Sequence, residues 1–305
     1  MLDDLTARDT AESTLCGAIE AGGTKVVCAI GTGPHNLRRE VFPTTLPAET
    51  LARMLEFFSD SGIVALGVAS FGPLDLDRLS PGYGRITSTP KPGWKNTDLV
   101  GPLRRALGVP IAFDTDVNAA AVGEVKWGAA KGLRDVLYIT VGTGVGGGAL
   151  VNGEPVHGLI HPEMGHIRVP RNPAEDGFPG VCPYHGDCIE GLVSGPAIAR
   201  RVGRPADSLP DDHEVWQLVA RYLALAIVNW MLTLSPQRVI LGGGVMSRLS
   251  LFPKVRQHVS NLLNQYVQTP AVVEHMDTYI VPPGLENDAG VLGALALAQE
   301  LTPAP

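Results

Sequence analysis

Apolar residues in the first third of the chain gather in short runs that glycine interrupts. Residues 17–20 form one such run, residues 25–30 form a second that is rich in Val and Ile, and Ala-Gly-Gly-Thr separates them. β-Branched runs joined by a glycine turn are typical of a β-hairpin. Comparable runs at 63–69, 109–113 and 237–241 predict further strands.

A second copy of the hairpin pattern begins at residue 136. The run 136–141 is followed by Gly142-Thr143-Gly144, and the run 145–151 ends at an Asn-Gly turn. Two such units far apart in one chain predict a duplicated domain with a nucleotide held between the halves, because each turn offers backbone N–H groups and a threonine hydroxyl to phosphate oxygens. Either hairpin alone is equally well explained as an ordinary glycine-rich turn.

The second hairpin also matches the dinucleotide-binding spacing G-x-G-x-x-G at Gly142, Gly144 and Gly147. That motif requires a helix directly after the glycines, since the helix N-terminus holds the pyrophosphate. Residues 148–153 are small and apolar and end in a turn, so a returning strand is predicted and dinucleotide binding is rejected. No Gly-Lys-Ser or Gly-Lys-Thr follows, which excludes a Walker P-loop.

Helical spacing of apolar residues appears mainly in the second half of the chain. Residues 213–234 predict a long core helix, and residues 289–301 predict an Ala- and Leu-rich helix that packs back on the first domain. Ser194 with Pro196 two residues later predicts a helix start, with serine as the cap and proline in the first turn. Residues 81–94, rich in Gly, Pro, Ser and Thr, predict a loop or lid.

Two aspartates stand where the strand 109–113 meets a predicted helix at 117–130. A carboxylate at a strand-to-helix junction often caps the helix, and this explains one of Asp114 and Asp116. The other is predicted to face a cleft as a general base, because phosphoryl transfer to an alcohol needs a group that accepts the hydroxyl proton.

Histidines and cysteines cluster in the middle of the chain. Cys182, His185 and Cys188 follow a C-x2-H-x2-C spacing, and a tetrahedral zinc requires four ligands of this kind. His161 and His166 both stand close enough in sequence to supply the fourth. The alternative is a metal-free turn with two buried cysteines, and the spacing favours the metal.

Composition narrows the class of protein. The 305 residues exceed the usual size of one core and predict two domains. A formal net charge of −7 without a Lys- and Arg-rich block argues against nucleic-acid partners. No apolar run reaches the roughly 18 residues of a membrane span, so no membrane partner is expected. Cys16 and Cys28 lie in apolar runs and are predicted to be small buried hydrophobes.

The start of the chain and the cysteine usage bear on location. Residues 1–14 are acidic and polar, do not resemble a signal peptide, and are predicted to be a short disordered lead. The four cysteines imply no disulfide framework, which indicates a cytoplasmic protein.

Several strings of residues, in this order, resemble the ROK family of sugar kinases. They are EAGGTK at Glu20–Lys25, DTDVN at Asp114–Asn118, GTGVGGG at Gly142–Gly148, EMGH at Glu163–His166, and the Cys/His cluster. The resemblance runs from about Gly17 to the end of the chain. The cluster with Glu-x-Gly-His is its specific part, whereas the glycine runs are generic.

The resemblance implies an actin-like (ribonuclease H-like) α/β fold with two α/β domains and a cleft between them. The small N-terminal domain would comprise residues 1–118 plus about 288–305. Residues 119–287 would form the larger domain, which carries the zinc site.

The resemblance also implies an ATP-dependent hexose 6-phosphotransferase with Mg²⁺, a structural zinc and Asp116 as the catalytic base. The zinc ligands would be His166, Cys182, His185 and Cys188, with His161 as the alternative to His166. The sugar would contact Gly72, Thr115, Asp116, Glu163, His166 and Glu190. ATP would contact Gly22, Gly23, Thr24, Lys25, Gly142, Thr143, Gly144, Pro196, Gly242, Gly243, Gly244, Val245 and Met246.

Two departures from the family pattern bear on the sugar. His185 stands where many members have a third cysteine, and Thr115 stands where glucokinases of the family commonly have Asn. Three features resemble the bacterial fructokinase branch: His185 in place of the cysteine, the string EAGGTK at Glu20–Lys25 and the string HPEMGH at His161–His166. This resemblance implies D-fructose as substrate and fructose 6-phosphate as product. Mannose and glucose stay as alternatives. The family also implies a homodimer.

Non-enzymatic alternatives come from the same resemblance. Sugar-responsive repressors of the family carry a helix-turn-helix domain before the first hairpin. Only 16 residues precede Gly17 here, so a repressor is not expected. A non-catalytic sugar- or nucleotide-binding module would keep the fold without phosphoryl transfer, but an aspartate together with two phosphate-binding hairpins favours the enzyme.

Overall fold

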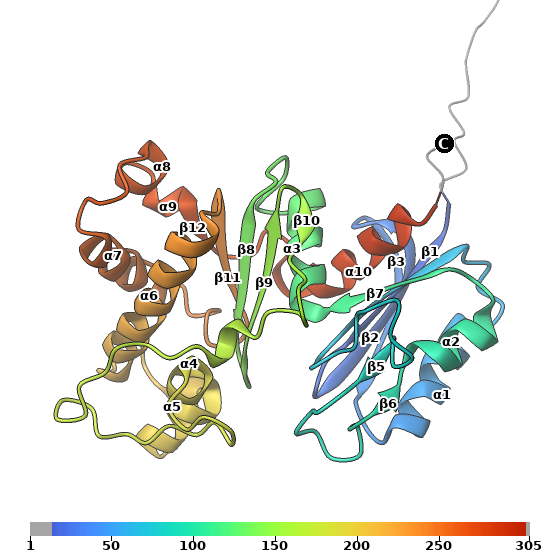
Figure 1. Cartoon of the computed structure of the whole chain (residues 1–305), viewed down its shortest axis with the longest axis horizontal. Coiled ribbons are helices and arrows are strands. Elements are labelled where there is room, and N and C mark those ends of the chain that lie inside the picture. The colour runs from blue at the N-terminus through green and yellow to red at the C-terminus, as the bar shows by residue number, and fades with distance from the viewer. Residues whose placement is uncertain (1–13, 303–305) are drawn as a thin grey trace, which may run out of the picture.

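The structure, a computed structural model, describes residues 14–302, so the predicted disordered lead lies outside the described residues except for Thr14. The chain folds around two five-stranded sheets (Figure 1). The first sheet has the order β3-β2-β1-β4-β7 and the second has the order β10-β9-β8-β11-β12. Both orders place an antiparallel meander beside two parallel strands, which confirms the predicted duplication.

The first sheet contains the hairpin predicted at the start of the chain. Its strands are β1 (Cys16–Ala21), β2 (Lys25–Gly33), β3 (Asn36–Pro43), β4 (Ala65–Ser70) and β7 (Ile111–Thr115). Alternate residues of β1 face opposite sides, as the pleat requires. Ile19 packs with helices α1 (Pro47–Phe58) and α2 (Val100–Leu107), whereas Ala18 packs with α10 (Ala289–Glu300). Cys16 and Cys28 are buried in this sheet, as predicted.

The second sheet contains the second hairpin. Its strands are β8 (Val136–Val141), β9 (Val145–Val151), β10 (Glu154–Pro155), β11 (Arg238–Gly242) and β12 (Ile280–Val281). Gly147 and Gly148 lie within β9, so a strand and not a helix follows the glycine turn, and the rejection of a dinucleotide fold is confirmed. Helix α3 (Asp116–Trp127) packs on β8 and β9, and α6 (Val215–Leu234) packs with α7 (Leu251–Leu263) over the other face.

Helices α3 and α10 pack against each other between the two sheets (Figure 1). Small residues permit this close approach: a Cβ on Gly293 would overlap the carbonyl oxygen of Ala119. Helix α10 contacts β1 and β4, as predicted for a helix that packs back on the first sheet. The predicted domain limits near residues 118 and 288 fall at the starts of α3 and α10, and the division itself remains our prediction.

The remaining elements are short. They are β5 (Arg85–Ile86), β6 (Thr97–Asp98), η1 (Met164–His166), α4 (Ile189–Val193), α5 (Gly195–Val202), η2 (Ala206–Ser208), α8 (Pro270–Val273), α9 (Met276–Tyr279) and η3 (Glu286–Asp288). Strand β5 lies inside the segment predicted to be entirely loop, because its two residues pair with β6. Ser194 caps α5 by accepting from the backbone N–H of Ala197, as predicted.

Helix α6 bears on the prediction that no membrane partner is expected. Among the described residues it is the one helix that is long and apolar enough to cross a membrane. Within its most apolar 18-residue window, 61% of the residues are buried inside the protein, which is the environment of a core helix.

Candidate active site

The two glycine turns present exposed backbone between buried strands. In the first turn the Gly22 N–H donates to the carbonyl oxygen of Lys25 at 2.9 Å, and in the second the Gly142 N–H donates to Gly144 at 2.8 Å. Gly23, Thr24 and Lys25 are exposed, and so is Thr143. A second cation reaches the first turn, since the Lys91 ammonium donates to the Gly23 carbonyl oxygen at 2.5 Å. Lys91 was not predicted from the sequence, because it is far from this turn along the chain.

Glu20, at the end of β1, carries an unsatisfied carboxylate oxygen. Its Oε2 is buried and has no hydrogen-bond partner among the described residues. Burial, and then the charge of Asp116, raise the pKa of Glu20 to about 7. An unpaired carboxylate oxygen beside the turn predicted to bind phosphate fits a hard cation such as Mg²⁺, which is bound through few protein oxygens and several waters. Glu20 stands in the EAGGTK string, but the sequence alone assigned it no role.

The strand-to-helix junction distinguishes the two aspartates. Thr115 caps α3, because its Oγ1 accepts from the Asn118 N–H at 3.1 Å, so the prediction that one aspartate is the cap is wrong. Threonine and aspartate are both good caps, and the structure places Thr115, the last residue of β7, at the N-cap position of α3. Asp114 is buried and accepts from the Thr115 N–H, from the Asn118 side chain and from His157. Asp116 is left for the cleft.

Asp116 keeps most of its hydrogen-bonding capacity. Its Oδ1 accepts from the Val117 N–H at 2.9 Å, and burial raises the pKa of Asp116 to about 6. A carboxylate with a raised pKa at a helix N-terminus is suited to accept a proton near neutral pH.

Among the residues predicted to contact the sugar, Glu163 and Glu190 lie in an acidic neighbourhood, whereas Thr115 is buried. Burial, and then the carboxylates of Glu190 and Asp116, raise the pKa of Glu163 to about 7, which places three acidic groups in one neighbourhood. Glu190 is anchored, since its Oε2 accepts from the Val145 N–H in the second hairpin at 3.1 Å. Thr115 is only 4% exposed and its hydroxyl caps α3, so its side chain is not available to contact the sugar as predicted.

The four side chains of the Cys/His cluster (His166, Cys182, His185 and Cys188) converge. Their ligand atoms all lie within 4.8 Å of one another. Bonds of about 2.3 Å to sulfur and about 2.0 Å to nitrogen put the S–N edges of a zinc tetrahedron at about 3.5 Å and the N–N edge at about 3.3 Å. Three of the four S–N separations are 3.5–3.7 Å, and the two Nδ1 atoms are 3.3 Å apart. The donor set and its spacing therefore fit zinc.

The fourth ligand atom is the Nδ1 of His166. His161, the alternative, is turned elsewhere, because its Nε2 accepts from the backbone N–H of Leu74 at 2.9 Å. With Nδ1 directed into the cluster, His166 retains Nε2 for another partner. The cluster also adjoins the acidic groups, since η1 joins His166 to Glu163 and Cys188 precedes α4, which carries Glu190.

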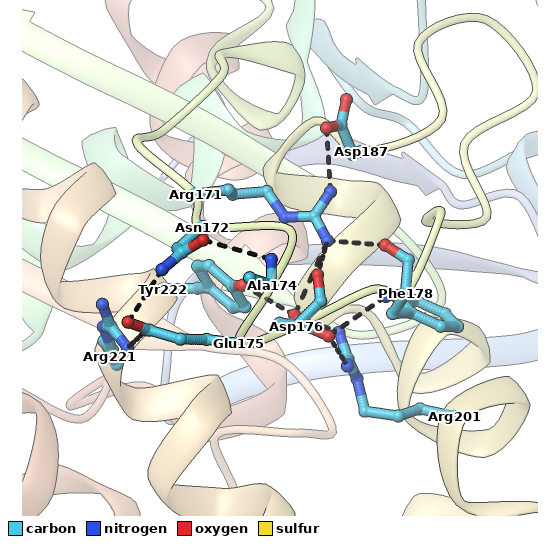
Figure 2. Close-up of polar contacts among 10 residues, drawn as sticks. All are labelled: Arg171, Asn172, Ala174, Glu175, Asp176, Phe178, Asp187, Arg201, Arg221 and Tyr222. Carbon is cyan, nitrogen blue, oxygen red and sulfur yellow. Dashed lines mark hydrogen bonds and ion pairs between the residues drawn. The ribbon is translucent and has the colours of Figure 1, made fainter.

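Charged side chains hold the segment that carries the cluster onto the helices behind it (Figure 2). Arg171 donates to Asp187 at 2.9 Å and to the backbone carbonyl of Phe178 at 2.6 Å. Asp176 pairs with Arg201 on α5 and accepts from the Tyr222 hydroxyl on α6 at 2.6 Å. Both Arg171 and Asp176 are nearly buried, so these contacts tie the segment to the second sheet's helices independently of a metal.

A cavity of about 1000 Å³ opens beside the second hairpin. This is the size of a small-molecule site. Predicted residues that line it are Gly142, Thr143, Pro196, Gly244 and Val245. By contrast, Gly242 and Met246 are buried, and neither they nor Gly243 line the cavity.

Several lining residues were not predicted from the sequence. Arg248 pairs with Asp211 and stacks over the ring of Trp216, with 4.4 Å between the guanidinium carbon and the ring centroid. Asp207 lines the same cavity. Chain folding brings these residues together from separate helices and loops, so no local motif marks them.

Two sheets of the same order, a carboxylate at the helix start between them and a nucleotide-sized cavity beside a glycine hairpin define a protein of the actin-like ATPase fold. The ROK family description matches residues 16–301, and the chain belongs to the ROK family. It is 45% identical to the fructokinase of Zymomonas mobilis, covering 94% of this chain and 97% of that protein. It is 43% identical to the fructokinase of Lactococcus lactis subsp. cremoris, covering 95% and 98%.

A solved structure supports the same architecture. The ROK hexokinase from Thermus thermophilus superposes with a TM-score of 0.74 at 27% identity, covering 94% of this chain and 98% of that one. The predicted actin-like fold and family are thereby confirmed.

Proposed function

We propose that the chain is an ATP-dependent fructokinase, which transfers the γ-phosphoryl group of ATP to the 6-hydroxyl of D-fructose. The observation that carries the proposal is the position of Asp116, a carboxylate of raised pKa at the start of α3 between the two hairpin sheets. Family relatives called fructokinase match the chain over nearly its whole length. They support fructose before mannose or glucose.

The chemistry follows from the order of the groups. Asp116 accepts the proton of the 6-hydroxyl as that oxygen attacks the γ-phosphorus, and the bond from phosphorus to the β–γ bridging oxygen breaks to release ADP. The backbone of the two hairpin turns, with Thr143 and Lys25, binds phosphate oxygens. Glu20 would hold Mg²⁺, which supplies charge neutralisation at the phosphates when it is bound.

The sugar is held by the acidic side of the cleft. Glu163 accepts from sugar hydroxyls, Glu190 offers its second carboxylate oxygen, and His166 donates through Nε2. Gly72 lets the backbone approach the sugar. Zinc bound by the Cys/His cluster is structural: four protein ligands leave no position for a reacting water, so its role is to fix the ring of His166.

Base and ribose occupy the cavity lined by Pro196, Gly244 and Val245. We also propose a homodimer in the cytoplasm. The four free cysteines support a reducing compartment, and the family resemblance suggests the dimer.

The test is an ADP-release assay with fructose, mannose, glucose and N-acetylmannosamine at saturating Mg-ATP. Fructose should give the highest kcat/KM, and the product should be fructose 6-phosphate by NMR. A higher kcat/KM for another hexose would reassign the sugar. No ADP release above the ATPase background with any sugar would favour the non-catalytic module.

A further inference from the structure

Two histidines on one loop connect the second sheet to the first. The loop follows β10, and both histidines reach across to the ends of first-sheet strands. His157 Nε2 lies 3.0 Å from the carboxylate of Asp114, which belongs to β7. His161 Nε2 lies 2.9 Å from the backbone nitrogen of Leu74, in the turn that follows β4. Both contacts lie next to residues of the proposed sugar site.

The hydrogen bonds assign opposite roles to the two rings. Asp114 is an acceptor, so His157 carries a proton on Nε2 and donates. Leu74 offers a backbone N–H, which can only donate, so His161 Nε2 must be bare and its proton must sit on Nδ1. Burial lowers the pKa of His161, which is consistent with a neutral ring.

His161 stands between two parts of the sugar site. Its Nδ1 lies 3.7 Å from Glu163 Oε1 on one side. On the other side its Nε2 is packed against Gly72, where an added Cβ would come within 3.2 Å of that nitrogen. The ring is only 5% exposed, and it fills the space between the Gly72 turn and the glutamate.

We propose that His161 is a positioning residue for sugar binding: its neutral ring joins the Leu74 backbone to the Glu163 side of the cleft and so sets the separation of two sugar-contacting walls. It does not touch the reacting atoms. It acts through Glu163 and the Gly72 turn, and so its loss should weaken the binding of the hexose without affecting the binding of ATP.

The test compares His161→Leu, which cannot accept a hydrogen bond, with His161→Gln, whose Oε1 can accept from Leu74. Leaving the Leu74 N–H unpaired should lower kcat/KM for the hexose roughly tenfold to a hundredfold, mostly through KM. The KM for ATP should change less than about twofold, and the glutamine variant should recover most of the loss. His275→Leu is the control, because that histidine is exposed and directly precedes α9, outside the proposed sugar site.

Three results would overturn the proposal: unchanged hexose kcat/KM in His161→Leu, a parallel rise in the KM for ATP, or a glutamine variant as impaired as leucine. Should the leucine variant not fold, ¹⁵N NMR of histidine-labelled wild type decides, with His161 assigned from the glutamine variant. A neutral ring protonated on Nδ1 supports the proposal, and a proton on Nε2 refutes it. The role of His161 rests on the proposed function only for the identity of the substrate, and it is measured with whichever hexose the wild type phosphorylates. A wild type that prefers another hexose would change the proposed function but would still allow the role of His161 to be tested.

Discussion

Asp116 and its neighbour Asp114 differ in the hydrogen bonds that their carboxylates accept. The Asp114 carboxylate accepts from three donors, including His157, whereas the Asp116 carboxylate accepts from one backbone N–H. The Asp116→Asn substitution keeps that hydrogen bond and removes the base, so kcat should fall about 10²–10⁴-fold while the KM values for sugar and ATP change little. A coupled ADP assay with thermal melts measures this, with Asp277→Asn on the surface as control. Turnover above a tenth of wild type would remove Asp116 as the base.

The raised pKa of Asp116 predicts how activity depends on pH. The base must be ionised, and burial places its pKa at about 6, so kcat/KM should fall as the pH drops through about 6. Protonation of Glu163 and Glu20, whose pKa values are raised to about 7, should add to this fall, so the loss should begin below about pH 7. Steady-state rates with fructose at saturating Mg-ATP give the profile. A constant kcat/KM from about pH 7 down to about pH 5 would contradict the assignment.

At the level of elements, Asp176 shows how the segment that carries the Cys/His cluster is held. Burial would raise the pKa of Asp176, but hydrogen bonds from Arg201 and Tyr222 outweigh it and hold that pKa at about 2. The folded pKa lies below the unfolded value of about 3.9, so the stabilisation is present above about pH 4 and is lost as the pH falls toward about 2.

Replacing Asp176 should therefore lower the free energy of unfolding more at neutral pH than in acid. Asp176→Asn should lower the free energy of unfolding by about 2 kcal/mol at neutral pH, and the difference from wild type should shrink near pH 3. Urea titrations at neutral pH and near pH 3 measure the difference in the free energy of unfolding at each pH. Glu175→Gln is the matched control: this neighbour is exposed and pairs with Arg221 at the surface, so its replacement should change the free energy of unfolding much less than the replacement of Asp176. An equal loss in both variants would contradict the role of the Asp176 network.

Elements with local signals were predictable from the sequence. The Gly142 turn was readable because glycine and flanking β-branched residues specify a hairpin locally. Strand β3 was missed because its exposed edge position leaves a charged stretch without alternation, and charged edges are how proteins keep free strand edges from pairing. Thr115 could not be chosen over the adjacent aspartates as the cap, since all three residues cap well.

The parts of the site that depend on contacts between residues far apart in the chain could not be predicted from the sequence. His157 meets Asp114 across 43 positions of chain, and nothing near either residue signals the other. Trp216 and Arg248 meet in the cavity only because α6 and the loop before α7 fold together. The Cys/His cluster was predictable because three of its ligands lie in one turn, and only the fourth ligand required the fold to choose His166 over His161.

Across the whole molecule, the proposed zinc site would connect metal binding to the sugar and not to ATP. His166 belongs both to the cluster and to the proposed sugar wall, while the nucleotide cavity is lined by Pro196, Gly244 and other residues outside the cluster. Cys188→Ser should therefore abolish zinc binding, raise the KM for fructose at least about tenfold, and leave the KM for ATP nearly unchanged.

The contacts of Arg171 and Asp176 hold the same segment without a metal, so this variant should remain folded with a lowered melting temperature. Elemental analysis should give one zinc per chain in wild type and none in the variant. Cys28→Ser, at a buried cysteine away from the cluster, controls for general destabilisation. Zinc can also be removed from the wild type and its absence confirmed. Full activity of this zinc-free protein would show that sugar binding does not depend on the cluster. An equal rise in the KM values for fructose and ATP would show that the zinc supports only the fold.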